Sequence, residues 1–326
     1  MDDETGMRRA IEVASTARVV AHPNPWVGAV LAPGDHAGAT AAPGGPHAEA
    51  VALQAAGEAA RGATLYVTLE PCCGFAGKAT TPCAEALIEA GVARVVVGMA
   101  DPDPRVSGRG LARLRDAGID VEVGVCEAEV RAQLAPYVVH RNTGRPYVVV
   151  KLAATLDGGT AAADGTSQWI TGPEARTDAH RLRAESDAVV VGAGTVRLDD
   201  PTLTVRHVDG RDPRRVVLGK APAGAKVHPC DEVEGDLGAL LDRLGADGVV
   251  QVLVEGGAAV AGAFHRAGLV DRYVVYLAPA LFGGDDARGL FAGPGAASID
   301  DLWRGRIVET TVLGDDLRVV LEPKAA

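Results

Sequence analysis

The sequence lacks an excess of basic residues. Its 32 Lys and Arg face 43 Asp and Glu, and the formal net charge is −11. No overall positive field therefore attracts a phosphate backbone, although the net charge does not exclude a local basic groove. This charge disfavours nucleic acid as a partner and favours a small-molecule substrate. The 326 residues, 47% hydrophobic and 23% charged, suit a globular protein of two domains, each with its own core.

Cysteines are few, and long apolar runs are missing. The five cysteines are an odd number, and three of them lie within residues 72–83, unlike the disulfide framework of a secreted protein. The first residues are acidic (Asp2, Asp3, Glu4) instead of a basic segment followed by an apolar run, and no stretch approaches the length of a membrane span. We therefore expect a cytoplasmic protein without a membrane partner, and we expect it to be a homo-oligomer.

Short apolar strands alternate with longer Ala-rich helices, which predicts an α/β fold. The predicted helices cover residues 7–20, 47–60, 83–91, 110–117, 174–185 and 258–267. The predicted strands cover residues 27–31, 64–69, 95–99, 121–125, 147–152, 188–191, 215–218, 249–254 and 273–277. The polar segment 140–146 interrupts this alternation, and it predicts one domain over residues 1–144 and a second over residues 145–326.

One constellation in the first domain has the residues of a zinc site. His47, Cys72 and Cys83 supply one imidazole and two thiolates, and Glu49 supplies a carboxylate that need not bind metal. Three protein ligands leave one position of a zinc ion open for water, whose pKa zinc lowers toward neutrality. Glu49 can then move a proton from the water to a leaving amine. The pattern predicts a zinc-dependent deaminase.

Two simpler interpretations remain at this stage. His47 can cap a helix while the cysteines pack as small hydrophobic residues, or a purely structural zinc can use Cys73 as a fourth ligand. A non-catalytic scaffold stabilised by zinc would follow from the second. The order of four suitable residues, with a proline before both Cys72 and Cys83, favours the catalytic site.

Glycines follow two predicted strands of the second domain. Gly192 and Gly194 follow the strand 188–191, but Arg197 breaks the full dinucleotide-binding motif. Gly256 and Gly257 lead into the helix 258–267, and backbone amides at such a helix start bind anions. These features indicate a nucleotide site without establishing one.

Several motifs of the first half resemble a known family. They are residues 22–28 (HPNPWVG), 47–49 (HAE), 68–72 (TLEPC), 101–104 (DPDP) and 108–110 (GRG). This half resembles the cytidine-deaminase-like fold, and in particular the deaminase domain of the RibD family of bifunctional riboflavin biosynthesis enzymes. The resemblance implies that Asn24, Asp101 and Asp103 contact the substrate. The ten residues between Cys72 and Cys83 depart from the family, whose loop is two residues shorter and carries a histidine; Lys78 would there face the substrate phosphate.

The second half resembles the reductase domain of the same family, which has a dihydrofolate-reductase-like fold. The matching motifs are residues 151–158, 167–171, 182–183, 194–196, 199–206, 255–257, 278–279 and 282–284. The resemblance implies that NADPH is held by Ala154, Trp169, Thr195, Asp199 and Gly257, and that substrate is held by Ser167, Arg183, Leu203, Arg206 and Glu255. Lys220 is a further candidate for the 2′-phosphate of NADPH.

The two resemblances together imply a bifunctional enzyme with zinc and NADPH as cofactors. It would deaminate 2,5-diamino-6-(5-phosphoribosylamino)pyrimidin-4(3H)-one and then reduce the ribosyl group of the product to give 5-amino-6-(5-phosphoribitylamino)uracil. The chemistry of Arg183 and Arg206 agrees, since guanidinium groups bind phosphate oxygens in pairs. The alternatives are a base deaminase acting on nucleic acid, a paralogue of secondary metabolism that acts on another pyrimidine, and the non-catalytic scaffold.

Overall fold

The structure is a computed structural model that describes residues 1–74 and 81–324. The chain forms two compact units, Met1–Gly144 and Arg145–Ala326, which are considered separately. Among the described residues, no helix has both the length and the apolar composition needed to cross a membrane.

The first unit is built on a five-stranded sheet. The strands, β1 (Gly28–Ala32), β2 (His36–Ala39), β3 (Thr64–Leu69), β4 (Arg94–Met99) and β5 (Asp120–Val123), lie in the order β2-β1-β3-β4-β5. β1 is antiparallel to both of its neighbours, while β3, β4 and β5 are parallel. Leu69 pairs with Met99, so β3 and β4 end together, and the loops that follow them meet at one edge of the sheet.

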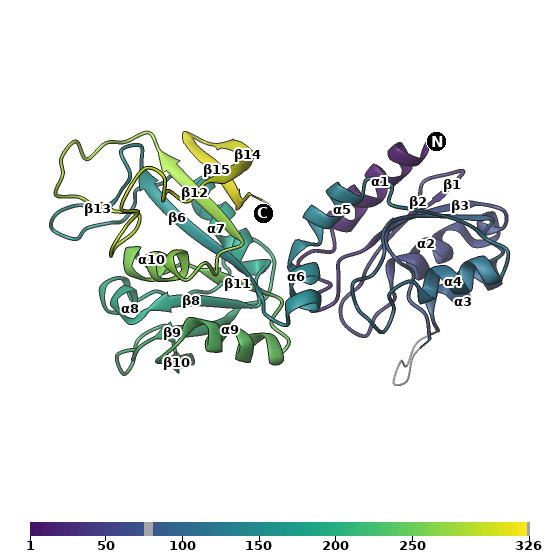
Figure 1. Cartoon of the computed structure of the whole chain (residues 1–326), viewed down its shortest axis with the longest axis horizontal. Helices are drawn as coiled ribbons and strands as arrows, with labels where there is room; N and C mark the ends of the chain where they lie inside the picture. Colours follow the sequence, from purple (N-terminus) through teal and green to yellow (C-terminus); the bar gives the residue numbers. More distant parts are fainter. Residues whose placement is uncertain (75–80, 325–326) are drawn as a thin grey trace. The chain divides into compact units, whose positions relative to one another are not determined.

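Helices cover both faces of this sheet. They are α1 (Asp3–Ser15), α2 (Ala48–Ala56), α3 (Cys83–Ala90), α4 (Arg109–Asp116), α5 (Glu127–Gln133) and α6 (Ala135–Thr143), with a 3₁₀ turn η1 at Gly57–Ala60. In Figure 1, α1 and α5 lie on one side of the sheet and α2, α3 and α4 on the other. The helix α1 packs closely on β1, because a Cβ atom at Gly28 would lie 2.0 Å from the carbonyl oxygen of Ala10.

The polar segment 140–146 contains the division between the two units, but its first four residues are helical and not part of a linker. Residues 140–143 form the last turn of α6, which ends at Gly144 with a φ of 78°. The helix persists because its preceding turn buries Pro136, Tyr137 and Val138, so that its polar residues occupy a helical face instead of a loop.

The second unit contains an eight-stranded sheet. Its strands are β6 (Tyr147–Thr155), β8 (Ala188–Gly192), β9 (Arg214–Leu218), β10 (Asp231–Val233), β11 (Gln251–Val254), β12 (Arg272–Ala278), β14 (Gly305–Leu313) and β15 (Asp316–Pro323), in the order β10-β9-β8-β11-β6-β12-β15-β14. The first six are parallel, and the sequence did not predict the antiparallel β15 and β14 that extend the sheet. A separate ribbon pairs β7 (Gly159–Ala161) with β13 (Arg288–Gly289).

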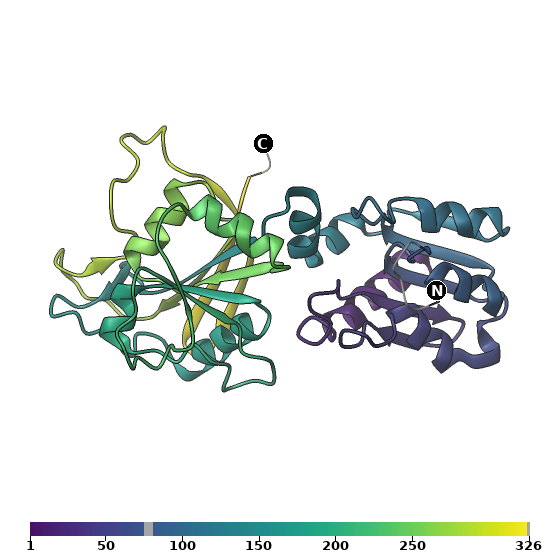
Figure 2. The ribbon, with the colours of Figure 1, turned by 90° about the horizontal axis from the view of Figure 1, so that it is seen from below.

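Four helices complete this unit: α7 (Pro173–Ala184), α8 (Ala193–Asp199), α9 (Leu237–Ala246) and α10 (Ala258–Arg266). α9 and α10, green in Figures 1 and 2, pack Leu241 and Phe264 into a core against the sheet. On α7, Asp178 accepts a hydrogen bond of 2.6 Å from the Tyr276 hydroxyl of β12. The helices α8 and α10 begin where the parallel strands β8 and β11 end, so their N-termini lie at one edge of the sheet.

Candidate active sites

Three elements bring the predicted zinc ligands together. His47 immediately precedes α2, Cys72 follows β3, and Cys83 is the first residue of α3. His47 Nδ1 lies 3.5 Å from Cys72 Sγ and 3.4 Å from Cys83 Sγ, and all three ligand atoms lie within 4.8 Å of one another. Over residues 1–74 and 81–324 this is the only group of three or more such side chains able to hold a metal ion.

The distances fit a zinc ion. Ligand atoms at roughly 2.0 Å (N) and 2.3 Å (S) from a tetrahedral zinc lie about 3.5 Å apart, which agrees with the two distances from His47. The backbone N–H of Cys83 donates to Cys72 Sγ at 3.3 Å, a contact that favours the thiolate. Cys73 is not part of the group, because its buried thiol instead contacts the carbonyl oxygen of Arg105 at 3.8 Å. A fourth ligand from Cys73 is therefore not supported.

A cavity of about 270 Å³ opens beside these ligands. Its lining includes the predicted residues Asn24, Glu49, Asp101 and Asp103, together with His47 and Cys72. Glu49 is only 3% exposed, and burial, followed by the nearby thiolate of Cys72, raises the pKa of its carboxyl group. A carboxylate with a raised pKa is suited to general acid–base chemistry. Lys78, the remaining substrate residue predicted for this domain, lies outside the described residues.

A buried carboxylate that the sequence analysis did not assign organises one wall of the cavity. Glu70 is 3% exposed and accepts hydrogen bonds from four backbone N–H groups, two in the loop between β4 and α4 and two in the first turn of α4. Its Oε2 accepts from Asp101 (3.1 Å) and Gly108 (2.9 Å), and its Oε1 accepts from Gly110 (2.9 Å) and Leu111 (3.4 Å). Glu70 therefore ties the end of β3 to the loop that presents Asp101.

The same wall contains residues of α6. The Tyr137 hydroxyl donates to Asp101 at 3.0 Å, and the guanidinium of Arg141 lies over the Tyr137 ring at 5.1 Å. Burial raises the pKa of Asp101 to about 6, against its hydrogen bonds from Asp103 and Tyr137. Arg105, by contrast, lowers the pKa of Asp103 to about 2 through paired hydrogen bonds of 2.6 and 2.9 Å. The two predicted aspartates are therefore in opposite electrostatic environments, and no motif of the chain indicates this difference.

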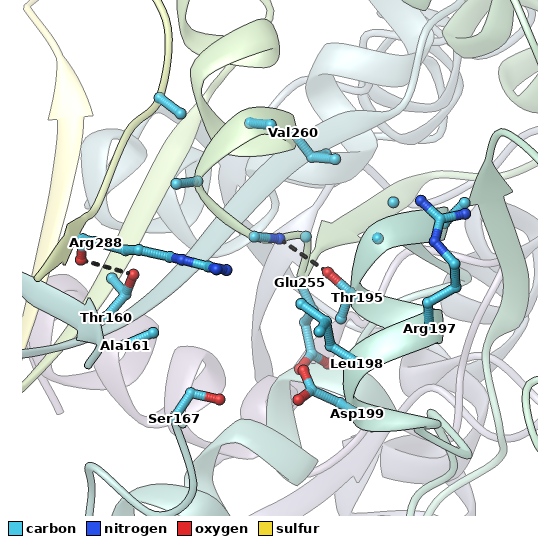
Figure 3. Close-up of a pocket in the computed structure, with 18 of the residues that line it drawn as sticks. Thr160, Ala161, Ser167, Thr195, Arg197, Leu198, Asp199, Glu255, Val260 and Arg288 are labelled. Carbon is cyan, nitrogen blue, oxygen red and sulfur yellow. Dashed lines mark hydrogen bonds between the residues drawn. The ribbon is translucent and has the colours of Figure 1, made fainter. Parts of the chain in front are cut away.

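A larger cavity of about 810 Å³ lies in the second unit, and Figure 3 shows it in close-up. Its lining includes the predicted residues Ser167, Thr195, Asp199, Glu255 and Gly257, and also the candidate Lys220. The N–H of Gly257, at the start of α10, donates to the Thr195 hydroxyl at 3.3 Å, drawn as a dashed line in Figure 3. The glycine-bearing ends of β8 and β11 thus meet at one pocket.

Three further basic residues line this cavity, although the sequence analysis assigned them no role: Lys151, Arg197 and Arg288. Arg288 extends into the pocket from the β13 side in Figure 3. Together with Lys220, these groups suit a ligand that carries several phosphates, as NADPH does. Burial lowers the pKa of Lys151, and Arg183 adds to the effect while Glu255 opposes it.

The other five predicted residues of the second unit do not line the cavity. Ala154 is fully buried within β6, and Trp169 is 70% exposed with Arg176 over its ring at 4.8 Å. Arg183 and Arg206 form part of a separate hydrogen-bonded assembly that reaches the cavity through Glu255, while Leu203 packs in the hydrophobic core beside it.

The link is an ion pair that the sequence did not predict. Arg183 donates to both carboxylate oxygens of Glu255, Nε at 2.5 Å and Nη2 at 2.9 Å. The side chains are 13% and 7% exposed. Burial alone would raise the pKa of Glu255, but the Arg183 guanidinium, together with smaller effects of Lys151 and His180, outweighs burial and the pKa is lowered. Arg183 and Glu255 are consequently one buried unit at the wall of the cavity.

Comparisons with known proteins assign both halves. Residues 1–99 match the cytidine and deoxycytidylate deaminase zinc-binding region, and residues 146–319 match the RibD C-terminal domain. The riboflavin biosynthesis protein RibD of Escherichia coli K12 is 40% identical, over 97% of this chain and 98% of its own. The chain belongs to the RibD family. The RibD protein of Mycobacterium tuberculosis CDC 1551 is 41% identical over 98% of this chain and 97% of its own.

Solved structures agree with this assignment. RibD of Acinetobacter baumannii superposes with a TM-score of 0.90 at 38% identity, covering 99% of both chains. A deaminase/reductase of Thermotoga maritima superposes with a TM-score of 0.87 at 34% identity, covering 98% of both chains. The predicted fold, a cytidine-deaminase-like domain followed by a dihydrofolate-reductase-like domain, is confirmed. The chain is a bifunctional deaminase and reductase of riboflavin biosynthesis, with zinc and NADPH as cofactors.

Proposed function

We propose that the chain converts 2,5-diamino-6-(5-phosphoribosylamino)pyrimidin-4(3H)-one into 5-amino-6-(5-phosphoribitylamino)uracil in two steps. Residues 1–144 would deaminate the pyrimidine, and residues 145–326 would then reduce the ribosyl group. The related Thermotoga maritima structure is described as a diaminohydroxyphosphoribosylaminopyrimidine deaminase and 5-amino-6-(5-phosphoribosylamino)uracil reductase, which supports this substrate. The observation that carries the proposal is the convergence of His47, Cys72 and Cys83 beside a cavity that contains Glu49.

In the deaminase domain, His47, Cys72 and Cys83 would hold zinc, which as a bound Lewis acid lowers the pKa of water. Glu49 would take a proton from water on its carboxylate and deliver it to the departing amine. Asn24, Asp101 and Asp103 would orient the pyrimidine, and Lys78 would contact its phosphate. The burial of Glu49 supports its role, since a carboxylate of raised pKa both accepts and returns a proton.

In the reductase domain, NADPH when bound supplies the hydride. Thr195, Asp199 and Gly257 would hold the cofactor at the wall of the cavity. Ala154 and Trp169, the other two residues predicted to hold NADPH, lie outside the lining of this cavity. Ser167, Arg183, Leu203, Arg206 and Glu255 would hold the substrate. The exposed guanidinium of Arg206, hydrogen-bonded to the hydroxyls of Thr202 and Thr204, is available to a sugar phosphate.

The test offers the purified enzyme the diaminopyrimidine and follows ammonia release and NADPH oxidation separately. We expect oxidation to follow deamination, and immediate oxidation when the deaminated pyrimidine is supplied. Glu49→Gln should keep its zinc and its reductase activity while ammonia release falls by a factor of 10² or more, because the proton carrier is lost. Unchanged ammonia release would refute the mechanism. Activity on a different pyrimidine alone would identify a paralogue with another substrate.

We also propose that the enzyme is cytoplasmic and forms a homo-oligomer. The zinc thiolates favour a reducing compartment. The edge strand β14 supports self-association, because it exposes Ile307 (59%), Val308 (39%) and Val312 (71%) at the end of the large sheet. Light scattering on the purified chain measures its mass directly, and a monomer at micromolar concentration would contradict the oligomer.

A further inference from the structure

A buried histidine lies behind the substrate-binding assembly of the reductase domain. His180, on α7, is 5% exposed, and its Nδ1 accepts a hydrogen bond of 3.1 Å from the backbone N–H of Arg206. The ring of His207 meets the ring of His180 edge-on, with the centroids 4.4 Å apart. One histidine therefore contacts two consecutive residues of the segment that carries Arg206.

That segment has little regular structure of its own. Residues 201–206 lie between α8 and β9 without belonging to a helix or strand, and Leu203 has a positive φ of 55° although it is 3% exposed. Non-glycine residues rarely hold this conformation unless surrounding contacts impose it. Leu203 is held by the core cluster of β8, α8 and β9, while residues 204 and 206 are held from α7.

Two residues of α7, one turn apart, supply those contacts. Arg183 donates from Nη1 to the carbonyl oxygen of Thr204 at 3.1 Å, while its other nitrogens are paired with Glu255. His180 accepts from Arg206, two residues further along. A donor and an acceptor on the same face of α7 thus hold the backbone at alternate residues of the segment, including Arg206, whose guanidinium then reaches the hydroxyls of Thr202 and Thr204.

We propose that His180 is a positioning residue of the reductase. By accepting a hydrogen bond from the backbone N–H of Arg206, it places Arg206 to bind the phosphate of the pyrimidine substrate. The inference rests on the proposed function, in which Arg206 contacts that phosphate. His180 itself touches neither substrate nor cofactor in this role. Its effect is therefore on substrate affinity and not on the hydride transfer.

The protonation state of His180 agrees with this role. Nδ1 accepts a hydrogen bond only when it carries no proton, which requires the neutral ring with its proton on Nε2. Burial lowers the pKa of His180 to about 4, and Arg183, the His207 ring and Arg206 add to the effect against the opposing charge of Glu255. The ring is accordingly neutral, and able to accept, throughout the physiological range.

The experiment compares two substitutions at His180 in the full chain loaded with zinc. His180→Leu keeps the apolar volume but removes the acceptor, whereas the side-chain oxygen of His180→Asn can take the place of Nδ1. With the deaminated pyrimidine as substrate, we expect His180→Leu to raise the KM about tenfold or more, equivalent to roughly 1.4 kcal/mol. The kcat and the KM for NADPH should stay within about twofold. His180→Asn should recover most of the lost affinity.

His265→Leu is the matched control. His265 also lies on a helix and bonds through Nδ1, to the Tyr273 hydroxyl at 2.7 Å, but it does not line the cavity. This variant should keep the KM of the wild type. A wild-type KM in His180→Leu would overturn the proposal. Equal impairment of both His180 variants in kcat and in both KM values would also overturn it, since His180 would then serve only the fold. Failure of the wild type to reduce this pyrimidine would instead refute the proposed function.

Discussion

Replacing Glu70 by glutamine should damage the deaminase while leaving the reductase intact. Each carboxylate oxygen of Glu70 accepts hydrogen bonds from two backbone N–H groups, Oε2 from the loop that presents Asp101 and Oε1 from the first turn of α4. Glutamine replaces one of these oxygens by an NH₂ group, which cannot accept a hydrogen bond. Two of these N–H donors, all of which are buried except that of the partly buried Gly108, then lose their acceptor whichever way the amide points.

The expected loss follows from those two donors. A buried donor left without an acceptor costs about 1–3 kcal/mol, so Glu70→Gln should lower the free energy of unfolding of the deaminase unit by roughly 2–6 kcal/mol. For a domain of this size that corresponds to a fall in Tm of at least about 5 °C. The loop also carries two residues proposed to bind the substrate, so the kcat/KM for ammonia release should fall at least tenfold. Neither His47, Cys72 nor Cys83 is touched, and zinc content should persist.

The measurements are calorimetry, metal analysis and the two activities of one preparation. The reductase activity of the same chain reports protein concentration and the integrity of the other unit. Glu89→Gln on α3 makes the same chemical change at an exposed position of the same unit, and it should leave all four measurements unchanged. The reasoning fails if Glu70→Gln keeps a wild-type Tm and a deaminase kcat/KM within twofold of the wild type.

Two further predictions concern the same domain. Cys83→Ser should release zinc and abolish deamination, whereas Cys73→Ser should keep about one zinc per chain by metal analysis. The reason is that Cys83 belongs to the metal-binding group and Cys73 does not. Burial raises the folded-state pKa of Asp101 to about 6 from 3.8, so the folded state takes up a proton between about pH 6 and pH 4. Asp101 therefore destabilises the unit by about 3 kcal/mol above pH 6 and less as the pH falls. In pH-dependent denaturation, the wild type should gain free energy of unfolding between about pH 6 and pH 4, and Asp101→Asn should lack this gain. An identical pH profile in the two proteins would contradict the raised pKa of Asp101.

The sequence predicted what periodicity and short motifs encode. Buried runs such as residues 95–99 and 249–254 alternate with amphipathic helices, and this alternation predicted strands that the structure contains as β4 and β11. The zinc ligands were predictable because histidine, glutamate and cysteine occur in one order with prolines before both ligand cysteines. The interpretation of residues 140–143 as part of an interruption was wrong, since polar residues on a helical face have the same composition as a linker.

Roles that depend on long-range partners had no such signal. Glu70 acts through N–H groups about 30–40 residues further along the chain, and Arg183 pairs with Glu255 across 72 residues. A sequence gives the identity of these side chains but not the backbone groups that meet them. Asp101 and Asp103 illustrate the consequence: they are identical residues two positions apart, yet burial raises one pKa and Arg105 lowers the other.

The two cavities differ in how their charged groups are held, and this difference bears on how each site tolerates substitution. In the deaminase, Glu70 accepts from four backbone N–H groups, and Asp101 accepts from one backbone N–H and from the Tyr137 hydroxyl, so the loop conformation and the charge are inseparable. In the reductase, the Arg183–Glu255 pair joins two side chains. Removing either partner leaves a buried charge without its counterion, which is far more costly than removing both. Substitution of Arg183 and Glu255 together should therefore retain more folded protein than either single substitution, even though all three variants lose the proposed substrate contact.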